Sequence, residues 1–223
     1  DHRDLHSFPT RRSSDLAFYQ AINIEAIKKK VMRGFAVPAG LITPPAVHGY
    51  TEELNSRRPF DVAAAKKLMA DAGYGDGFSI QLDCPNNRYI NDEGICQAVV
   101  GMLAKINVKV TLSAIPKTIH FPKIKSRETD FYMLGWGVST LDSHYVFNYL
   151  TKGGDKNWNG TGFDDPKINQ LIDDMAVEVD FSKRDAMINT VWTRMRDNVN
   201  YLPLHHQRSE ERRVGKECRS RWS

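Results

Sequence analysis

Cysteine, long apolar runs and catalytic signature motifs are what this 223-residue sequence has least of. Its three cysteines, Cys84, Cys96 and Cys218, are too few and too widely spaced for a disulfide scaffold or a CxxC metal site. No apolar run approaches the ~18 residues of a membrane-spanning helix, and no apolar stretch near the N-terminus resembles a signal peptide. The motifs HExxH, GxSxG and Walker A are also missing. The sequence therefore predicts neither a membrane span nor a zinc, serine-hydrolase or P-loop site.

The composition that remains is that of a globular protein. Hydrophobic residues make up 41% and aromatic residues 10%, which suits one domain or two small ones. The formal charge is +4, and much of the excess lies in residues 208–223. A basic tail of this kind is one alternative, and it would suggest a nucleic-acid partner.

The two ends of the chain, however, are related to each other through their codons. AGA TCG GAA GA encodes Arg208, Ser209 and the start of the pair Glu210-Glu211, and its reverse complement, TCT TCC GAT CT, encodes Ser13, Ser14, Asp15 and the start of Leu16. Both ends look like the translation of one sequencing adapter on either side of a DNA fragment. We therefore expect residues 1–16 and 208–223 to be non-native flanks and exclude them from fold reasoning. The remainder, 17–207, is nearly neutral, so no nucleic-acid partner is expected.

Hydrophobic periodicity, together with helix caps and helix-stopping glycines, predicts the helices and strands of residues 17–207. Asn23 and Asp61 are candidate helix caps, while Gly34 and Gly73 are candidate helix stops. Between these helices, the proline-rich segment 35–60 should be extended and run over the surface. Helices are expected at 22–33, 61–73, 91–106, after Pro116, at 165–178 and at 182–199, and strands at 78–84, 108–114, 130–136 and 201–206.

Strands and helices alternate between residues 78 and 136, which is typical of an α/β layer with helices covering a sheet. The segment 130–136 (DFYMLGW) is apolar on both faces, so we expect it to be a central strand.

The best candidate for a functional site begins where that strand ends. Ligand sites of α/β sheets lie at the carboxyl ends of strands. Gly135 and Gly137 allow close approach of a ligand, Trp136 offers a flat apolar or cation-binding face, and Asp142 can pair with a cation. The alternative is structural: Trp136 packs in the core and Asp142 caps a helix at 143–150.

Three other motifs have simpler interpretations. The glycines of GYGDG (73–77) precede a strand, so they indicate a helix stop and a turn and not a phosphate cradle. His205 and His206 are adjacent in a strand and point to opposite faces, so they cannot share a metal ion. Asn159-Gly160-Thr161 matches a glycosylation acceptor by chance in a glycine-rich turn.

Four stretches carry a family resemblance: FDVAAAKKLMADAGYGDGFSIQL, NNRYINDEGICQAVVGMLAKINVKVTL, FYMLGWG, and NGTGFDDPKINQLIDDM followed by YLPLHHQ. In order and spacing they resemble the C-terminal half of the extracytoplasmic solute-binding proteins of family 5, the dipeptide- and oligopeptide-binding components of ABC transporters. The resemblance implies an incomplete α/β clamshell of the type II, cluster C-like kind, with 17–207 as its C-terminal lobe. It further implies a monomeric parent protein outside the cytoplasm that delivers a peptide-like solute to a membrane permease, without cofactor or catalysis.

The resemblance also assigns roles to particular residues. Cys84 and Cys96 would be able to pair in an oxidising periplasm; two buried free thiols are the alternative. Peptide-binding members carry an acid for the solute's amino group a few residues after the Gly-Trp pair, where this chain has Ser139. A hydroxyl cannot neutralise a buried ammonium. Either Asp142 takes that role or the solute is not a simple peptide, and the family also contains binders of sugars and nickel complexes. The expected ligand-binding set is Trp136, Gly137, Ser139 and Asp142.

Two rival functions remain at this point. An α/β hydrolase would need a nucleophile and a base within reach of each other, and the sequence offers no such pair. A structural or partner-binding fragment would have no small-molecule site. In the transport interpretation, residues 17–207 alone expose a face meant to be buried, so the fragment should aggregate or bind its solute weakly.

Overall fold

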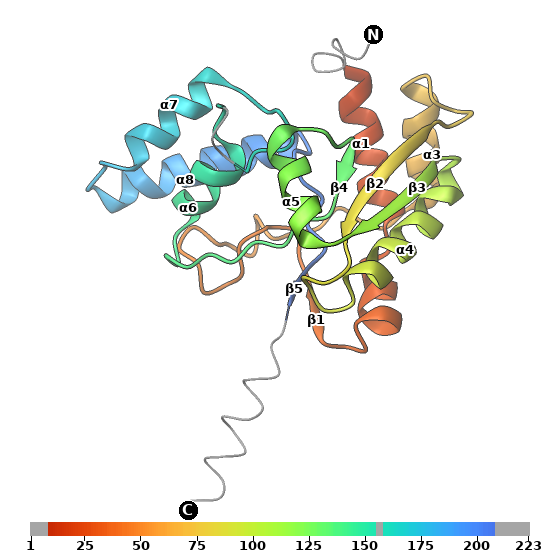
Figure 1. Cartoon of the computed structure of the whole chain (residues 1–223). Helices are drawn as coiled ribbons and strands as arrows, with labels where there is room; N and C mark the ends of the chain where they lie inside the picture. The colour runs from red at the N-terminus through yellow and green to blue at the C-terminus, as the bar shows by residue number, and fades with distance from the viewer. Residues whose placement is uncertain (1–8, 155–157, 208–223) are drawn as a thin grey trace, which may run out of the picture.

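The computed structural model describes residues 9–154 and 158–207. Its elements form two parts (Figure 1). One is an α/β part around a small sheet, and the other is a helical part made by α6 (Ser143–Val146), α7 (Pro166–Met175) and α8 (Phe181–Asp197). Between them run extended segments and a short antiparallel pair, in which β1 (Ala36–Pro38) bonds to β5 (His205–Gln207). The expected α/β architecture is therefore present.

The sheet has three parallel strands in the order β3-β2-β4. β2 (Ser79–Pro85) pairs along its whole length with β3 (Lys109–Ile115), close to the ranges expected from alternation. β4 is only Phe131–Tyr132 and lies at an edge of this sheet. The prediction of a central strand at 130–136 was therefore wrong.

The reason lies in the residues that follow β4. Met133 still donates its backbone N–H to the carbonyl of Asp83 at 3.0 Å, and then the chain leaves the sheet. Met133 packs with the core of the α/β part, whereas Leu134 and Trp136 pack with the core of the helical part. The segment is apolar on both sides because it joins two cores, a condition that sequence periodicity does not distinguish from a central strand.

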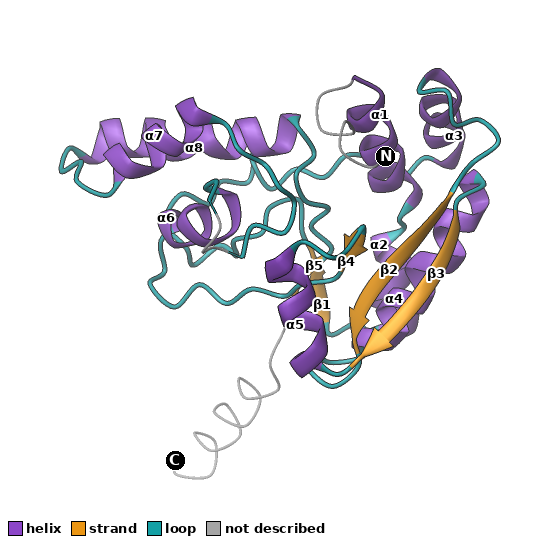
Figure 2. Ribbon diagram, turned by 45° about the horizontal axis from the view of Figure 1, so that its top comes forward, coloured by secondary structure: helices purple, strands orange, loops and turns teal. Residues whose placement is uncertain are grey.

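Helices pack against the sheet, with α4 along one face of it (Figure 2). α4 (Asp92–Leu103) contacts both β2 and β3 and continues into a 3-10 turn, η2 (Ala104–Ile106), while α5 (Lys117–Ser126) contacts β2. α3 (Val62–Asp71) begins at its predicted cap, since Asp61 accepts the N–H of Ala64 at 2.9 Å. Gly73 follows this helix with φ +82°, a conformation that suits glycine.

The N-terminal helix was not expected from the sequence. α1 (Pro9–Ala21) runs without a break across the proposed boundary between residues 16 and 17. The helix expected at 22–33 forms as α2 (Ile24–Ala26) and the π-helical η1 (Ile27–Val31), and the side chain of Asn23 caps it as predicted. Ala17, Ala21 and Ile22 are buried in the core of the α/β part.

The second core belongs to the helical part. It is closed by α6 (Ser143–Val146) with the π-helical η3 (Phe147–Thr151), by α7 (Pro166–Met175) and by α8 (Phe181–Asp197). Phe147 and Trp192 are fully buried there, with ring centroids 4.7 Å apart. Within the described residues, no helix combines the length and apolar character needed to cross a bilayer.

Candidate functional site

Two loops meet at the carboxyl edge of the sheet, one after β2 and one after β4. The hydroxyl of Tyr89, in the first loop, donates to the carbonyl of Gly135, in the second, at 2.9 Å. A Cβ at Gly135 would lie only 2.7 Å from the Tyr89 ring, so a larger residue there would displace the ring. Burial raises the pKa of Tyr89, which keeps this donor protonated at neutral pH. The ends of two parallel strands are thus joined where α/β sheets present their sites.

A large open hollow of about 1910 Å³ extends along these loops and the exposed side of the α/β core. Arg88, Tyr89 and Trp136 line it together with Gly135 and Gly137. Apolar side chains of the sheet and of α1 form another part of its wall, among them Phe18, Ile80 and Phe131. The hollow therefore combines an apolar wall with a few polar groups, as small-molecule sites do.

Trp136 is half-buried in an aromatic group on the helical side of the hollow. Its ring centroid lies 5.9 Å from that of Tyr145, 6.0 Å from Tyr149 and 6.0 Å from Trp158. Its indole Nε1 is buried without a hydrogen-bond acceptor in the described part of the chain. Trp136 thus packs with a core and still lines the hollow, which combines both alternatives raised by the sequence.

Asp142 is held by three neighbours. It caps α6 by accepting the N–H of His144 at 2.8 Å, as the structural alternative predicts. The guanidinium of Arg184 donates to both of its carboxylate oxygens, at 2.8 and 2.9 Å, and Nδ1 of His48 lies 3.1 Å from Oδ2. The other ring nitrogen of His48 lies 2.7 Å from Asp185.

These contacts set the protonation state of Asp142. Partial burial raises its pKa, but the hydrogen bonds from Arg184, His144 and His48 outweigh burial and lower the pKa to about 2. Asp142 is therefore a carboxylate at neutral pH, and its charge is already paired with Arg184. Neither Asp142 nor the exposed Ser139 is among the residues that line the hollow.

Arg88 is a candidate that the sequence reasoning missed. It lies in the loop after β2, is exposed, and its guanidinium carbon is 5.0 Å from the ring centroid of Tyr89. The backbone N–H groups of Arg88 and Tyr89 both donate to the buried Asp92, at 2.9 and 3.0 Å, which fixes this loop. The available signal was the stretch NNRYINDE, which resembles the family and contains Arg88.

Cys84 and Cys96 are bonded to each other, with their Sγ atoms 2.09 Å and their Cα atoms 6.5 Å apart. The bond links the end of β2 to α4, so it ties the strand that leads to Arg88 to the helix behind it. Cys218 lies outside the described residues.

The remaining motifs have structural partners. Nε2 of His206 lies 3.0 Å from the carbonyl of Leu41. The side-chain amide of Asn159 is buried and donates to the carbonyls of Thr151, Lys152 and Phe163. No group of His, Cys, Asp and Glu residues suited to a metal ion occurs in the ranges 9–154 and 158–207.

Comparison with known proteins agrees with this arrangement. Residues 16–158 match the bacterial extracellular solute-binding proteins, family 5 Middle. The glutathione-binding protein GsiB of Salmonella typhimurium is 29% identical over 152 residues, which are 66% of this chain and 29% of that protein. GsiB of Escherichia coli K12 is 26% identical over 168 residues, which are 32% of its length. The chain thus spans about a third of these relatives.

Solved structures share the fold. The periplasmic binding protein DppA of Helicobacter pylori, in complex with a peptide, superposes with a TM-score of 0.80 at 20% identity, over 88% of this chain and 38% of that one. NikA of Brucella suis, in complex with Fe(III)-EDTA, gives 0.78 at 19% identity, over 91% and 43%. The predicted fold, one lobe of a periplasmic binding protein, is therefore confirmed. The chain belongs to the family 5 bacterial extracellular solute-binding proteins.

Proposed function

We propose that the protein to which this chain belongs captures a peptide-like solute and delivers it to an ABC permease in the membrane. The observation that carries the proposal is the meeting of the loops after β2 and β4 on one hollow, through the bond from Tyr89 to Gly135. Binding sites of open α/β sheets lie in this position.

Arg88 is the group that we assign to the solute's carboxylate. It is exposed on the hollow, and no carboxylate in the described part of the chain pairs with it in a salt bridge. A guanidinium binds a carboxylate through two parallel hydrogen bonds, which gives strength and direction. Trp136 supplies an apolar surface, and an acceptor on the solute would satisfy its unpaired Nε1.

Gly137, which lines the hollow, is the second contact that we assign to the solute, whereas Ser139 is exposed outside that lining. Gly137 has open space where a Cβ would be, so a ligand can approach its backbone closely. Asp142 takes an indirect role in this proposal, because its carboxylate is paired with Arg184. The solute's amino group would then need another acceptor, which favours a peptide-like solute other than a simple dipeptide. Relatives that are named as glutathione-binding support this class.

We infer that the parent protein works outside the cytoplasm, as a monomer and without catalysis. The relatives are solute-binding proteins, and one of the similar structures is described as periplasmic. The α/β hydrolase remains the rival from another class. We further propose that residues 1–16 and 208–223 are adapter-derived and that native segments flank 17–207 in the gene, which sequencing of the source DNA on both sides would test.

The test is thermal unfolding of the protein encoded by the uninterrupted gene, with glutathione, di- and oligopeptides, sugars and metal chelates. A solute that binds only the folded state raises the melting temperature. We expect a shift with a peptide-like solute and about tenfold to hundredfold weaker binding in Arg88→Gln. Lys66→Gln, which removes an exposed charge on α3 at the opposite end of the sheet (Figure 1), should bind normally. If no solute raised the melting temperature and the protein hydrolysed an ester or a peptide, the transport proposal would be wrong and the hydrolase would take its place.

A further inference from the structure

Three arginines gather beside Tyr19, apart from the loops assigned to the solute. Arg57 and Arg58 belong to the extended segment before α3, and Arg196 belongs to the last turn of α8. Burial raises the pKa of the Tyr19 hydroxyl, and the charges of these three arginines each act against that rise. Three like charges that all act on one hydroxyl define a centre of positive potential.

Two of these arginines already use donors on neutral acceptors. Nη1 of Arg57 donates to the carbonyls of Ala39 and Pro203, and its guanidinium lies 4.7 Å from the ring centroid of Tyr19. Arg196 donates to the carbonyl of Ser56 at 3.0 Å and to that of Glu53 at 3.4 Å. Carbonyls satisfy hydrogen bonds but leave the net charge in place.

Within the described residues, no carboxylate forms a salt bridge with the cluster. None of the salt bridges found within residues 9–154 and 158–207 includes Arg57, Arg58 or Arg196. The guanidinium of Arg58 makes no hydrogen bond to any described residue, so its five donors are available. By contrast, Arg184 and Arg194, on the same helix, both pair with aspartates.

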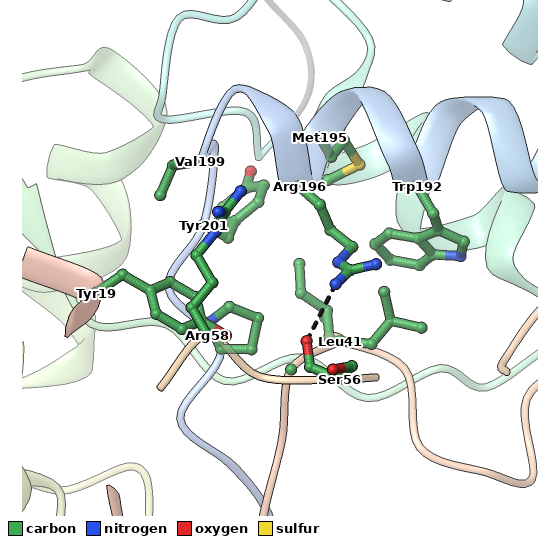
Figure 3. Close-up of a pocket in the computed structure, with 12 residues that line it drawn as sticks. Tyr19, Leu41, Ser56, Arg58, Trp192, Met195, Arg196, Val199 and Tyr201 are labelled. Atoms are coloured by element: carbon green, nitrogen blue, oxygen red, sulfur yellow. Dashed lines mark hydrogen bonds between the residues drawn. The ribbon is translucent and has the colours of Figure 1, made fainter. Parts of the chain in front are cut away.

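A small pocket lies within this cluster (Figure 3). Figure 3 shows Arg196 reaching from α8 toward Ser56, with Arg58 and Tyr19 among the other residues of the lining. The space measures about 30 Å³, and Leu41 and Trp192 contribute apolar walls. A space of this size holds one or two water molecules or an ion of similar size. A phosphate group is too large to enter it completely.

We propose that the pocket lined by Arg58 and Arg196 binds one small monovalent anion, either chloride or the carboxylate of a small acid. The anion would offset the mutual repulsion of the three guanidinium groups in a partly desolvated place. It would also join Arg58 to α8, close to the carbonyl of Pro203, where the chain turns into β5. This site does not depend on the proposed transport function.

The experiment uses the full 223-residue chain. Its melting temperature is measured while sodium gluconate, whose anion is too large for the pocket, is replaced by sodium chloride or sodium formate at constant ionic strength. We expect a rise of about 3 °C at tenfold excess over Kd. In parallel, the ³⁵Cl resonance of chloride should broaden when the protein is added. Formate should reverse the broadening if it occupies the same pocket, and phosphate should not.

Variants distinguish an anion-binding site from arginines that only hold neighbouring segments together. Arg58→Gln should retain the fold, because this guanidinium holds no part of the described chain, and should bind chloride about tenfold more weakly. Arg33→Gln removes an exposed arginine elsewhere and should behave as the wild type. Arg58→Lys should restore part of the binding. Equal melting shifts and equal broadening in the wild type and in Arg58→Gln would overturn the proposal and leave the arginines a structural role.

Discussion

The guanidinium of Arg184 binds both carboxylate oxygens of Asp142, with Nη1 2.8 Å from Oδ2 and Nη2 2.9 Å from Oδ1. The backbone of His48 bonds on either side of this aspartate, since its N–H donates to Leu141 at 2.8 Å and its carbonyl accepts from Ser143 at 3.1 Å. One aspartate therefore joins α8, the start of α6 and the segment before Gly49. It also fixes the far end of the segment that begins at Trp136.

Replacing Arg184 by methionine should destabilise the protein measurably. Arg184→Met keeps most of the side-chain volume but leaves the carboxylate of Asp142 without its bidentate partner. Hydrogen bonds to charged groups contribute about 1.5–3 kcal/mol, so we expect the free energy of unfolding in urea at pH 7 to fall by about 2 kcal/mol. Arg194→Met, which breaks a more exposed pair with Asp165, should cost less than about 1 kcal/mol.

The same pair should make stability depend on pH in an acidic window. The pKa of Asp142 is lowered to about 2 in the folded chain from an ordinary value of 3.8. A depressed carboxyl pKa stabilises the fold above the unfolded value, and that stabilisation is lost as the pH falls from about 4 toward 2. The stability of the wild type should therefore fall more steeply over this window than that of Arg184→Met. If the two proteins lost stability in parallel over this window, the ion pair with Arg184 would not be what lowers the pKa of Asp142.

The bond between Cys84 and Cys96 should be detectable by counting thiols. The unreduced chain, unfolded in denaturant, should show one free thiol, that of Cys218, and three after reduction. A disulfide that closes a loop this short stabilises by about 2–3 kcal/mol, so reduction should lower the melting temperature. The double variant C84A/C96A should melt like the reduced wild type. Three free thiols before reduction would show that Cys84 and Cys96 are not bonded to each other.

Lys123 and Asp83 should be the most sensitive ion pair of the α/β part. The Asp83 side chain is fully buried, and Nζ of Lys123 lies 2.7 Å from its Oδ1. Burial raises the pKa of Asp83, but hydrogen bonds from Lys123 and Thr129 outweigh burial and hold the pKa below its usual value. Lys123→Met should therefore cost about 3 kcal/mol at pH 7, measured by urea unfolding, because it leaves a buried charge unpaired.

An exposed pair and a double variant serve as controls for this prediction. Lys67→Met removes an exposed partner of Asp71 and should leave the midpoint of urea unfolding nearly unchanged. The double variant D83L/K123M should recover much of the loss, because it leaves no unpaired charge. If Lys123→Met destabilised the protein no more than Lys67→Met, the buried ion pair of Lys123 and Asp83 would contribute no more to stability than the exposed pair of Lys67 and Asp71.

Two glycines should respond in opposite directions to alanine. Gly77 has φ +80°, and a Cβ there would lie 1.8 Å from the carbonyl oxygen of Asn107. Gly77→Ala should therefore lower the melting temperature, with a cost well above 1 kcal/mol. Gly101, in α4, has open space around a Cβ, so Gly101→Ala should stabilise by up to about 1 kcal/mol. Equal changes in stability for the two substitutions would contradict the expectation that Gly77 needs glycine and Gly101 does not.

Local chemistry made much of the α/β part predictable from the sequence. The caps at Asn23 and Asp61 depend on one short side chain and an N–H three residues later, and both form as expected. Alternation placed β2 and β3 to within about a residue, because the alternating apolar side chains of each strand pack in the core of the α/β part.

The remaining features depend on contacts between distant positions. The partner of Asp142 lies 42 residues further along the chain, and no local pattern distinguishes Arg184 from the other arginines of α8. Tyr89 and Gly135 are 46 residues apart, so the contact between their loops emerges only in the fold. The same holds for β4, whose apolar residues serve two cores at once.

The turn at Asn159 has a consequence for making the protein. Its side-chain nitrogen donates to three carbonyls inside the fold, while the hydroxyl of Thr161 bonds to its oxygen at 2.7 Å. A sugar attached to that nitrogen would displace these bonds and enter a closed space. In a yeast or mammalian secretion host, glycosylation at Asn159 would have to precede folding, and each modified molecule would then be unable to close the turn. Bacterial expression, or Thr161→Ala in a eukaryotic host, avoids that loss.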